Sequence, residues 1–449
     1  MRSTSYNLMG YLMSCAAGLF LTSSLVCAAS VTVPDLPMVN NASLSLKDAV
    51  NIAMVDNITL QEADTDAKSA GAASKSAKAM LSPTVSMTTY GMYGDTSNVA
   101  ASSPGVLPQN IMLVDPNGFA DQNVTVMVPI YTGGKLELNS ASAHQQSQSA
   151  GFMAAGAKIA VTEAVTEAYA NTALQQSLVD TAQARLTAED EQVRITQQKV
   201  DAGSSAPVDL LREQAEQADA KQGVLAAQNG AGLALIQLKS AIGVSQESQI
   251  TIADTLDSLS ETELSPATLA DSLSQAEKNR PEMAAAATQI AAAKSGVGAV
   301  RGEYAPQIYG LAMGDAMSGS PAHMDYTVGI SASLPLFDGG QLGADRDTAS
   351  AKLERAQEAA QQTRQQVDQE AASAWLTEQT AVSEVEAATA GAAAAQQGYD
   401  LAVMRFNAGK SVEADRLDAL SALVRAEGDL AQAKAGMVIA RAKLKAAVG

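Results

Sequence analysis

The chain has 449 residues, a net charge of −19 and only 4% aromatic residues. Its length suffices for two or three domains, but so few aromatic side chains would not fill several ordinary globular cores. Dense alanine runs instead favour long helices that pack closely through small residues. The negative charge argues against nucleic acid as a partner, because phosphates demand a basic face. Solubility alone accounts for that charge.

Residues 1–28 have the pattern of a signal peptide. Arg2 is the only charged residue before Asp35, and an apolar stretch runs from about Leu8 to Val26. Small residues follow, so we expect cleavage before Ala29. A membrane anchor is the alternative, which the length of the stretch would just permit.

Both cysteines of the chain, Cys15 and Cys27, lie in this leader. Lipidation is therefore a second alternative, although Cys15 precedes most of the apolar region and Cys27 follows Val26, a poor residue there. With cleavage the mature chain carries no cysteine and needs neither a disulfide nor a thiol site.

The sequence repeats itself with an offset of 206 positions. The segment 128–134 returns as 334–340, and 238–243 returns as 444–449. The offset holds without an insertion between these points. Loops tolerate insertions whereas packed elements do not, so this register predicts an internal duplication built from long helices with fixed packing partners.

Apolar periodicity, β-forming alternation and prolines divide each repeat into the same elements. In the first repeat, 29–243, we expect a helix at 44–80, strands at 84–94 and 122–132, a long helix at 134–201, a tip at 202–206 and a helix at 207–242. A polar linker, 244–267, joins the repeats and packs partway along the helices. In the second repeat, 268–449, we expect a helix at 268–303, strands at 306–314 and 325–336, a long helix at 340–407, a tip at 408–411 and a helix at 412–448.

The two long helices carry no proline and show heptad-spaced apolar residues, which is typical of helices that pack as coiled coils. Tight turns at the tips reverse the chain. We expect Ser205 and Ser411 to cap the returning helices and Pro207 to occupy the first turn of one of them.

The strands carry aromatic and methionine side chains. Aromatic residues flank membrane strands, although aromatic residues also simply favour strands. The methionines would suit a soft metal, but methionine more often fills gaps in packing, so no metal site is expected. These methionines are Met87, Met92, Met127, Met313 and Met317.

The order helix, strand, strand, long helix, tip, helix resembles the TolC-like outer-membrane efflux proteins, the outer-membrane factor family. The resemblance spans about Leu44 to Gly449, and it depends on spacing and duplication rather than on any single motif. The motifs are Pro129–Gly134 with its echo, Ala168-Tyr169 with Ala374-Trp375, and the Ala-Gly tip turns followed by Asp209 and Asp415.

The resemblance implies a mainly α fold with a small β part. Each protomer of a homotrimer would give four strands to one outer-membrane β-barrel, continued by a periplasmic α-helical barrel. The physics of lipid agrees, because four strands enclose nothing and only closed barrels satisfy their backbone there.

The implied function is that of a passive duct in the outer membrane of a Gram-negative bacterium, multi-pass by β-strands, with a large periplasmic part. A periplasmic adaptor (membrane fusion) protein and an inner-membrane pump of RND or ABC type would feed it. No cofactor and no catalytic residue are expected; His144 and His323 are the only histidines and lie in different contexts.

Carried over position by position, the helical tips form the gate and meet the adaptor. The expected gate residues are Asp209, Arg405, Phe406, Lys410, Asp415 and Asp418. The expected adaptor contacts are Ala202, Gly203, Ser205, Leu210, Leu211, Ala408, Gly409, Ser411 and Leu417.

Acidic side chains at the tips have two interpretations. Three copies of Asp415 and Asp418 would form stacked rings that favour cations. An acid in the first turn of a helix also stabilises the helix, because it interacts favourably with the helix dipole. Asp209 fits both roles. Phe406 stands where family members use a tyrosine lock, so we hypothesise that Arg405 or Lys410 pairs with Asp209 or a neighbouring acid in the closed state.

Two other classes of protein compete with the duct. A soluble periplasmic coiled-coil scaffold explains the helices but not the two aromatic-rich hairpins at matching places. A periplasmic adaptor would carry one helical hairpin and a compact β domain, and the sequence predicts neither.

Overall fold

The computed structural model describes residues 36–92, 119–260, 268–318, 323–408 and 410–449. The predicted leader 1–28 with Cys15 and Cys27, residues 93–94, the linker residues 261–267 and Gly409 lie outside these ranges. The chain divides into two compact units, Met1–Pro37 and Met38–Gly449, and the elements below belong to the second.

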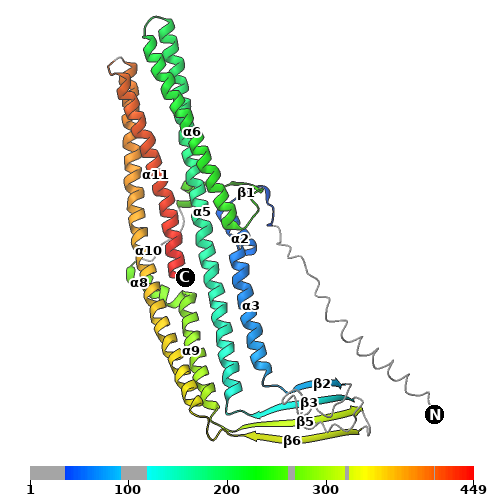
Figure 1. Ribbon diagram of the computed structural model, residues 1–449. Helices are drawn as coiled ribbons and strands as arrows, with labels where there is room; N and C mark the ends of the chain where they lie inside the picture. The colour runs from blue at the N-terminus through cyan, green and yellow to red at the C-terminus, as the bar shows by residue number, and fades with distance from the viewer. Residues whose placement is uncertain (1–35, 93–118, 261–267, 319–322, 409) are drawn as a thin grey trace, which may run out of the picture. The chain divides into compact units, whose positions relative to one another are not determined.

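The duplication is visible in the lengths of the helices (Figure 1). The first repeat contains α2 (Leu46–Asp56), α3 (Ile58–Ala79), β2 (Thr84–Met92), β3 (Phe119–Tyr131), α5 (Lys135–Asp201) and α6 (Pro207–Ile242). The second contains α8 (Leu269–Asn279), α9 (Pro281–Gly302), β5 (Gln307–Ser318), β6 (His323–Ser333), α10 (Gln341–Asn407) and α11 (Glu413–Val448). In both repeats the four helices have 11, 22, 67 and 36 residues.

The first helix of each repeat is broken, contrary to the single helices predicted at 44–80 and 268–303. Asn57 leaves the helical conformation, and its side chain accepts a hydrogen bond from Thr59 N at 2.9 Å, which starts α3. In the second repeat Arg280 is extended and Pro281 starts α9, because a proline cannot donate to the preceding turn. Periodicity alone missed these breaks, since both halves keep their apolar face in phase.

The breaks lie where the returning helices end. Gly243 ends α6 with φ +86°, and a Cβ there would lie 2.7 Å from Asp56 O. Asn57 Nδ2 donates to Ala241 O at 2.8 Å across the same junction. Gly449 repeats the arrangement at the end of α11, with φ +97° and a Cβ position 2.9 Å from Asn279. Each returning helix therefore abuts a break end to end.

The segment predicted as a linker contains regular structure. β4 (Gln249–Ile252) pairs in parallel with β1 (Asn40–Leu44), and α7 (Leu256–Ser260) follows. Tyr169 of α5 closes this region, because its hydroxyl donates to Leu44 O at 2.8 Å and lies 3.1 Å from an oxygen of Asp254. Burial raises the pKa of Tyr169 to about 12. The strand β4 was not predicted from the sequence, because the segment 244–267 is mostly polar.

The remaining strands form one antiparallel sheet in the order β2-β3-β5-β6. Cross-strand rows alternate in character, as side chains on successive residues point to opposite faces. One row contains Val85, Val126, Ala312 and Val328, and the next contains Ser86, Thr125, Met313 and Thr327. The sheet therefore has one apolar face and one largely polar face.

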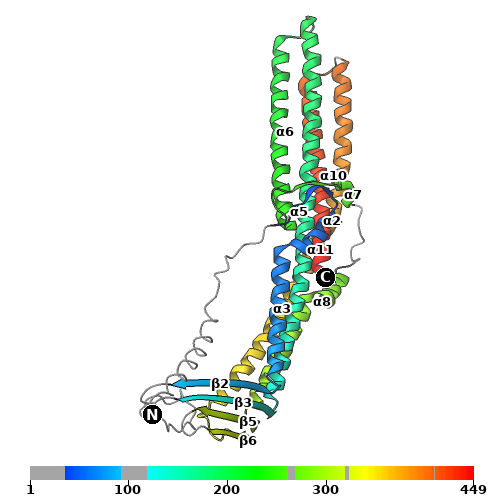
Figure 2. The same cartoon turned by 90° about the vertical axis from the view of Figure 1, so that its right-hand side faces the viewer.

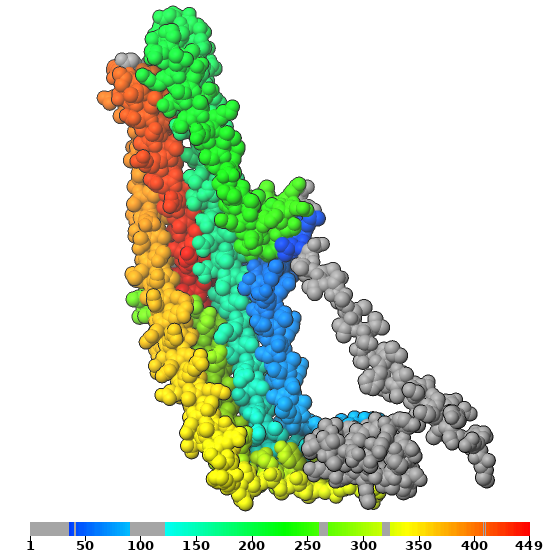
Figure 3. Space-filling view, in the orientation of Figure 1, coloured from blue at the N-terminus to red at the C-terminus, as the bar shows by residue number. Residues whose placement is uncertain are grey.

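The helices lie side by side in the order α10, α11, α5, α6 toward the tips (Figures 1 and 2). α5 packs against α3, α6, α9 and α11, whereas α10 packs against α8, α9 and α11. Figure 3 shows this order across one face. Among the helices in the described ranges, none has both the length and the apolar character needed to cross a bilayer.

We predict that Gly243→Ala destabilises the protein by about 1–3 kcal/mol, because a Cβ at a left-handed position would also meet the backbone of Asp56. Gly232→Ala is the control, since its Cβ position has nothing within 4 Å and alanine favours a helix. Thermal unfolding followed by circular dichroism measures both. Equal melting temperatures for the two variants would contradict the end-to-end junction.

Candidate functional site at the helical tips

Each long helix ends in a tight turn at the tip of a helical hairpin. Ala202 ends α5, and Gly203 follows with φ +72°. In the second repeat Ala408 ends α10, and Lys410 N donates to Arg405 O at 2.9 Å. The turns reverse the chain, so that α5 with α6 and α10 with α11 form two hairpins whose tips lie at the same end of the unit (Figure 1).

The predicted capping role of Ser205 and Ser411 is wrong. Ala206 and Val412 hold the N-cap positions, and neither provides a side-chain hydrogen bond. Ser205 Oγ instead donates to Asp209 Oδ2 at 2.9 Å, whereas Ser411 Oγ is buried and has no hydrogen-bond partner among the described residues. The turns are one residue longer than the capping pattern assumed. Pro207 does start α6.

Asp209 and Asp415 occupy the same third position of the returning helices α6 and α11. Asp209 accepts a hydrogen bond from Ala206 N at 3.1 Å, so it satisfies a free donor at the helix start. Asp415 and Asp418 are exposed. No ion pair joins Arg405 or Lys410 to Asp209 within the part of the single chain that the structure describes, and both cations are exposed.

Phe406 has no hydroxyl with which to form a hydrogen bond, but its ring makes a cation–π contact. Lys199 Nζ of α5 lies 5.0 Å from the centroid of the Phe406 ring on α10. A cation over an aromatic face is attracted to it by about 0.5–1 kcal/mol at an exposed site. The first hairpin thus contacts the second at Phe406, one of the positions predicted from the sequence to belong to a gate.

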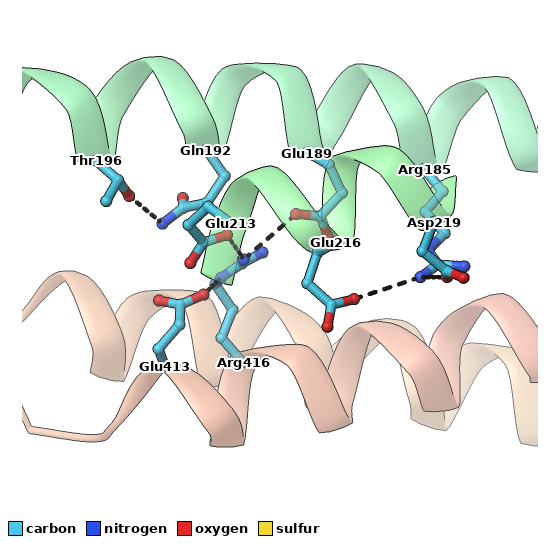
Figure 4. A network of polar contacts seen from close by, with 9 residues as sticks. All are labelled: Arg185, Glu189, Gln192, Thr196, Glu213, Glu216, Asp219, Glu413 and Arg416. Carbon is cyan, nitrogen blue, oxygen red and sulfur yellow. Dashed lines mark hydrogen bonds and ion pairs between the residues drawn. The ribbon is translucent and has the colours of Figure 1, made fainter. Parts of the chain in front are cut away.

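A second link between the hairpins was not predicted. Arg416 of α11 is only 4% exposed and extends toward α5 and α6 (Figure 4). Its Nη2 lies 3.5 Å from Glu213 Oε2 of α6 and 3.8 Å from Glu189 Oε2 of α5. Its Nε donates to Glu413, one turn earlier on α11. We call Arg416, Glu189, Glu213 and Glu413 the Arg416 cluster.

Burial controls the electrostatics of the Arg416 cluster. Glu213 is 2% exposed, and burial, together with the neighbouring carboxylate of Glu413, raises its pKa to about 7 against the opposing effect of Arg416. Burial also raises the pKa of Glu189, and Arg416 again opposes it. A buried carboxylate keeps a proton more readily than one in water.

A comparison of the two repeats could have indicated that Arg416 has a special role. Its counterpart in the first repeat is Leu210, which is half-buried. A charged residue in the place of a leucine on a packed face requires a buried partner, and Glu189 and Glu213 supply it. Sequence alone did not identify these partners, because they lie on other helices.

The chain belongs to the outer membrane efflux protein family, whose model matches residues 49–244 and 272–449. It is an efflux channel of the outer membrane. No protein with a curated description matches it.

Solved structures of outer-membrane channels share the fold. The outer-membrane channel OprN is 20% identical, with a TM-score of 0.72 over 90% of this chain and 89% of that one. The Campylobacter jejuni CmeC outer membrane channel is 15% identical, with a TM-score of 0.74 over 93% of each chain. The Neisseria gonorrhoeae MtrE outer membrane channel, solved in its open state, is 20% identical, with a TM-score of 0.72 over 90% of this chain and 88% of that one.

We predict that Arg416→Leu loosens the tips, because it leaves buried carboxylates without their cation at a cost of about 3–5 kcal/mol. Cleavage of the tips by proteinase K in the folded protein should become at least about tenfold faster. Arg194→Leu removes an arginine that pairs with Glu191 on the exposed surface of α5 and should leave the rate unchanged. Equal rates in the two variants would show that the Arg416 cluster does not hold the tips.

Proposed function

We propose that the protein is the outer-membrane duct of a tripartite export system, assembled as a homotrimer and gated at the helical tips. A periplasmic adaptor and an inner-membrane pump of RND or ABC type would deliver cargo to it. The observation that carries this proposal is the sheet, which has two unpaired edges and one exposed apolar face.

Among the described residues of the single chain, β3 and β5 have neighbours on both sides in the sheet, so β2 and β6 are its edges. Backbone groups at such edges have no water partners in lipid, and closure into a barrel satisfies them. The two edges differ, so β6 of one copy would pair with β2 of the next. Contacts of this head-to-tail kind generate rings when the rotation closes.

The apolar face of the sheet supports contact with lipid. On β6 the alternate residues of this face are more than 70% exposed in the single chain, whereas their neighbours along the strand are polar or glycine. The exposed residues are Met324 at 85%, Tyr326 at 86%, Val328 at 76% and Ile330 at 74%. Monomeric soluble proteins rarely leave so continuous an apolar patch in water.

The helical edges support the same assembly. α6 and α10 lie at opposite ends of the row of helices, and both expose large apolar side chains. On α6 these are Leu225 at 61%, Leu233 at 54% and Ile236 at 51%, and on α10 they are Leu376 at 57%, Leu401 at 52% and Met404 at 61%. Packing of α6 against α10 of the next copy would cover both sets.

The tips would form the aperture and the adaptor-binding surface. In a trimer Asp415 and Asp418 would each occur three times, and rings of carboxylates favour cations. Exposed apolar residues beside them suit an adaptor: Val208 at 60%, Leu211 at 65% and Val412 at 64%. Ala202, Gly203, Ser205, Leu210, Ala408, Gly409, Ser411 and Leu417 complete the proposed contact surface.

Fractionation tests the duct against the alternative of a soluble periplasmic scaffold. We expect the full-length protein in the outer-membrane fraction, released only by detergent and migrating as a trimer in native electrophoresis. Recovery of the protein in the soluble periplasmic fraction would contradict the duct.

Planar-bilayer recordings test the gate. We expect charge reversal of Arg405 and Lys410 to Glu to raise single-channel conductance, because Asp209 or a nearby acid of a neighbouring copy would lose its cation. Exposed pairs are worth up to about 1 kcal/mol, so a severalfold change is expected. Asn at Asp415 and Asp418 should lower the preference for cations over anions.

Arg194→Glu, on the exposed face of α5, where Arg194 pairs with Glu191, is the control for the charge reversal. Unchanged conductance in the Arg405 and Lys410 variants would contradict the proposed pairing, and unchanged ion preference would contradict the acidic rings.

A further inference from the structure

The Arg416 cluster buries more negative than positive charge. Three carboxylates surround one guanidinium, and Glu189 and Glu213 are 0% and 2% exposed. The side chain of Glu413 is 17% exposed. Burying an anion without full compensation is costly, so such a site favours uptake of a proton.

No second cation lies within the cluster among the described residues. On α5, Arg185 faces Glu189 from one turn away, but its Nη2 lies 2.9 Å from Asp219 and 3.7 Å from Glu216 of α6. The buried amide of Gln192 lies 3.5 Å from Thr196 Oγ1. Glu216 of α6 also acts on Glu189, and Glu413 and Arg416 of α11 act on both Glu189 and Glu213 (Figure 4).

Several oxygens in the cluster have no hydrogen-bond donor. Both carboxylate oxygens of Glu189, one of Glu213 and one of Glu413 are buried and unsatisfied. A proton on Glu213 would supply a donor that the cluster lacks, because a carboxyl O–H donates to a neighbouring carboxylate. Glu413 is the neighbour that faces Glu213.

We propose that the Arg416 cluster is a proton-dependent clasp between the two helical hairpins of one protomer. In the closed clasp a proton is held between Glu213 and Glu413, and Arg416 pairs with the remaining charge. When the proton leaves to water, Glu213 becomes a third carboxylate, beside Glu413 and Glu189, and repulsion separates α6 from α11.

The direction of the pH dependence follows from the pKa of Glu213, about 7 in the closed clasp against 4.5 for an ordinary glutamate. The closed state binds the proton more tightly than the separated state. Its extra stability is therefore complete below pH 4.5 and is lost as the pH rises through about 7. One proton changes the closing equilibrium by up to about tenfold per pH unit in that window.

This contact lies within one protomer, so it goes beyond the proposed gate, which depends on contacts between copies. Only the consequence for conductance rests on the proposed function. A distance measurement within one chain therefore keeps the two proposals separate.

The test is electron paramagnetic resonance between nitroxides at Ser204→Cys and Ala414→Cys, both exposed at the tips. The full chain, with Cys15 and Cys27 replaced by Ala, is co-expressed with excess unlabelled chain so that most assemblies carry one labelled copy. We expect the wild-type distance distribution to widen with a midpoint near pH 7. In Glu213→Gln the width should not change between pH 5 and pH 9.

Glu191→Gln is the matched control, because Glu191 lies on the exposed face of α5 and pairs with Arg194; it should behave as the wild type does. A pH transition that persists in Glu213→Gln, or its absence from the wild type, would overturn the clasp. If Glu213→Gln does not fold, Glu413→Gln replaces it, and its transition should lie at lower pH. An unchanged midpoint in Glu413→Gln also overturns the clasp.

Conductance recorded on the same samples separates the clasp from the gate. A distance that depends on pH together with a conductance that does not would support the clasp and contradict gating at the tips.

Discussion

The need to cover a 67-residue helix along its whole length shapes the rest of the molecule. Among the described residues, only α5 and α10 reach this length, so two shorter helices in succession cover each of these two. The covering helices are α6 and α3 for α5, and α11 and α9 for α10, with 36 and 22 residues in each case. The covering helices must meet end to end. Gly243 and Gly449, which end α6 and α11, permit this close approach because neither carries a Cβ. The end of α6 lies against the helix break at Asn57, and the end of α11 lies against the break at Arg280.

Equal lengths in the two repeats bring both hairpin tips to the same end of the unit, where their few differences decide how the hairpins hold together. Leu210 in the first repeat is matched by Arg416 in the second, and the arginine reaches carboxylates on both helices of the first hairpin. Near the turns, Lys199 of α5 makes a cation–π contact with the ring of Phe406 on α10. The two hairpins share the same backbone arrangement, but the side chains at the contact between them differ. These differing side chains form the contacts that join the two halves of one protomer.

Periodicity and the repeat offset predicted the long helices, the strands and the turns to within a few residues, because these features depend on local sequence. They did not predict the breaks at Asn57 and Arg280, which depend on the ends of helices distant in sequence. β4 was missed because its partner β1 lies about 200 residues earlier. The buried partners of Arg416, Glu189 and Glu213, come from two other helices, so only the tertiary structure identifies them. The family resemblance led to a predicted gate at the tips, but it did not lead to the buried cluster nearby, which none of the predicted gate residues belongs to.

Our central proposal is that different edges of neighbouring copies join to close a ring of three. The most direct measurement is cross-linking, in intact cells, of chains that carry Met87→Cys on β2 and Val328→Cys on β6, with a short flexible bifunctional maleimide. A closed ring predicts dimers and trimers and nothing larger, and each single-cysteine chain should give no trimer. Monomers alone, or a ladder extending beyond three chains, would contradict it.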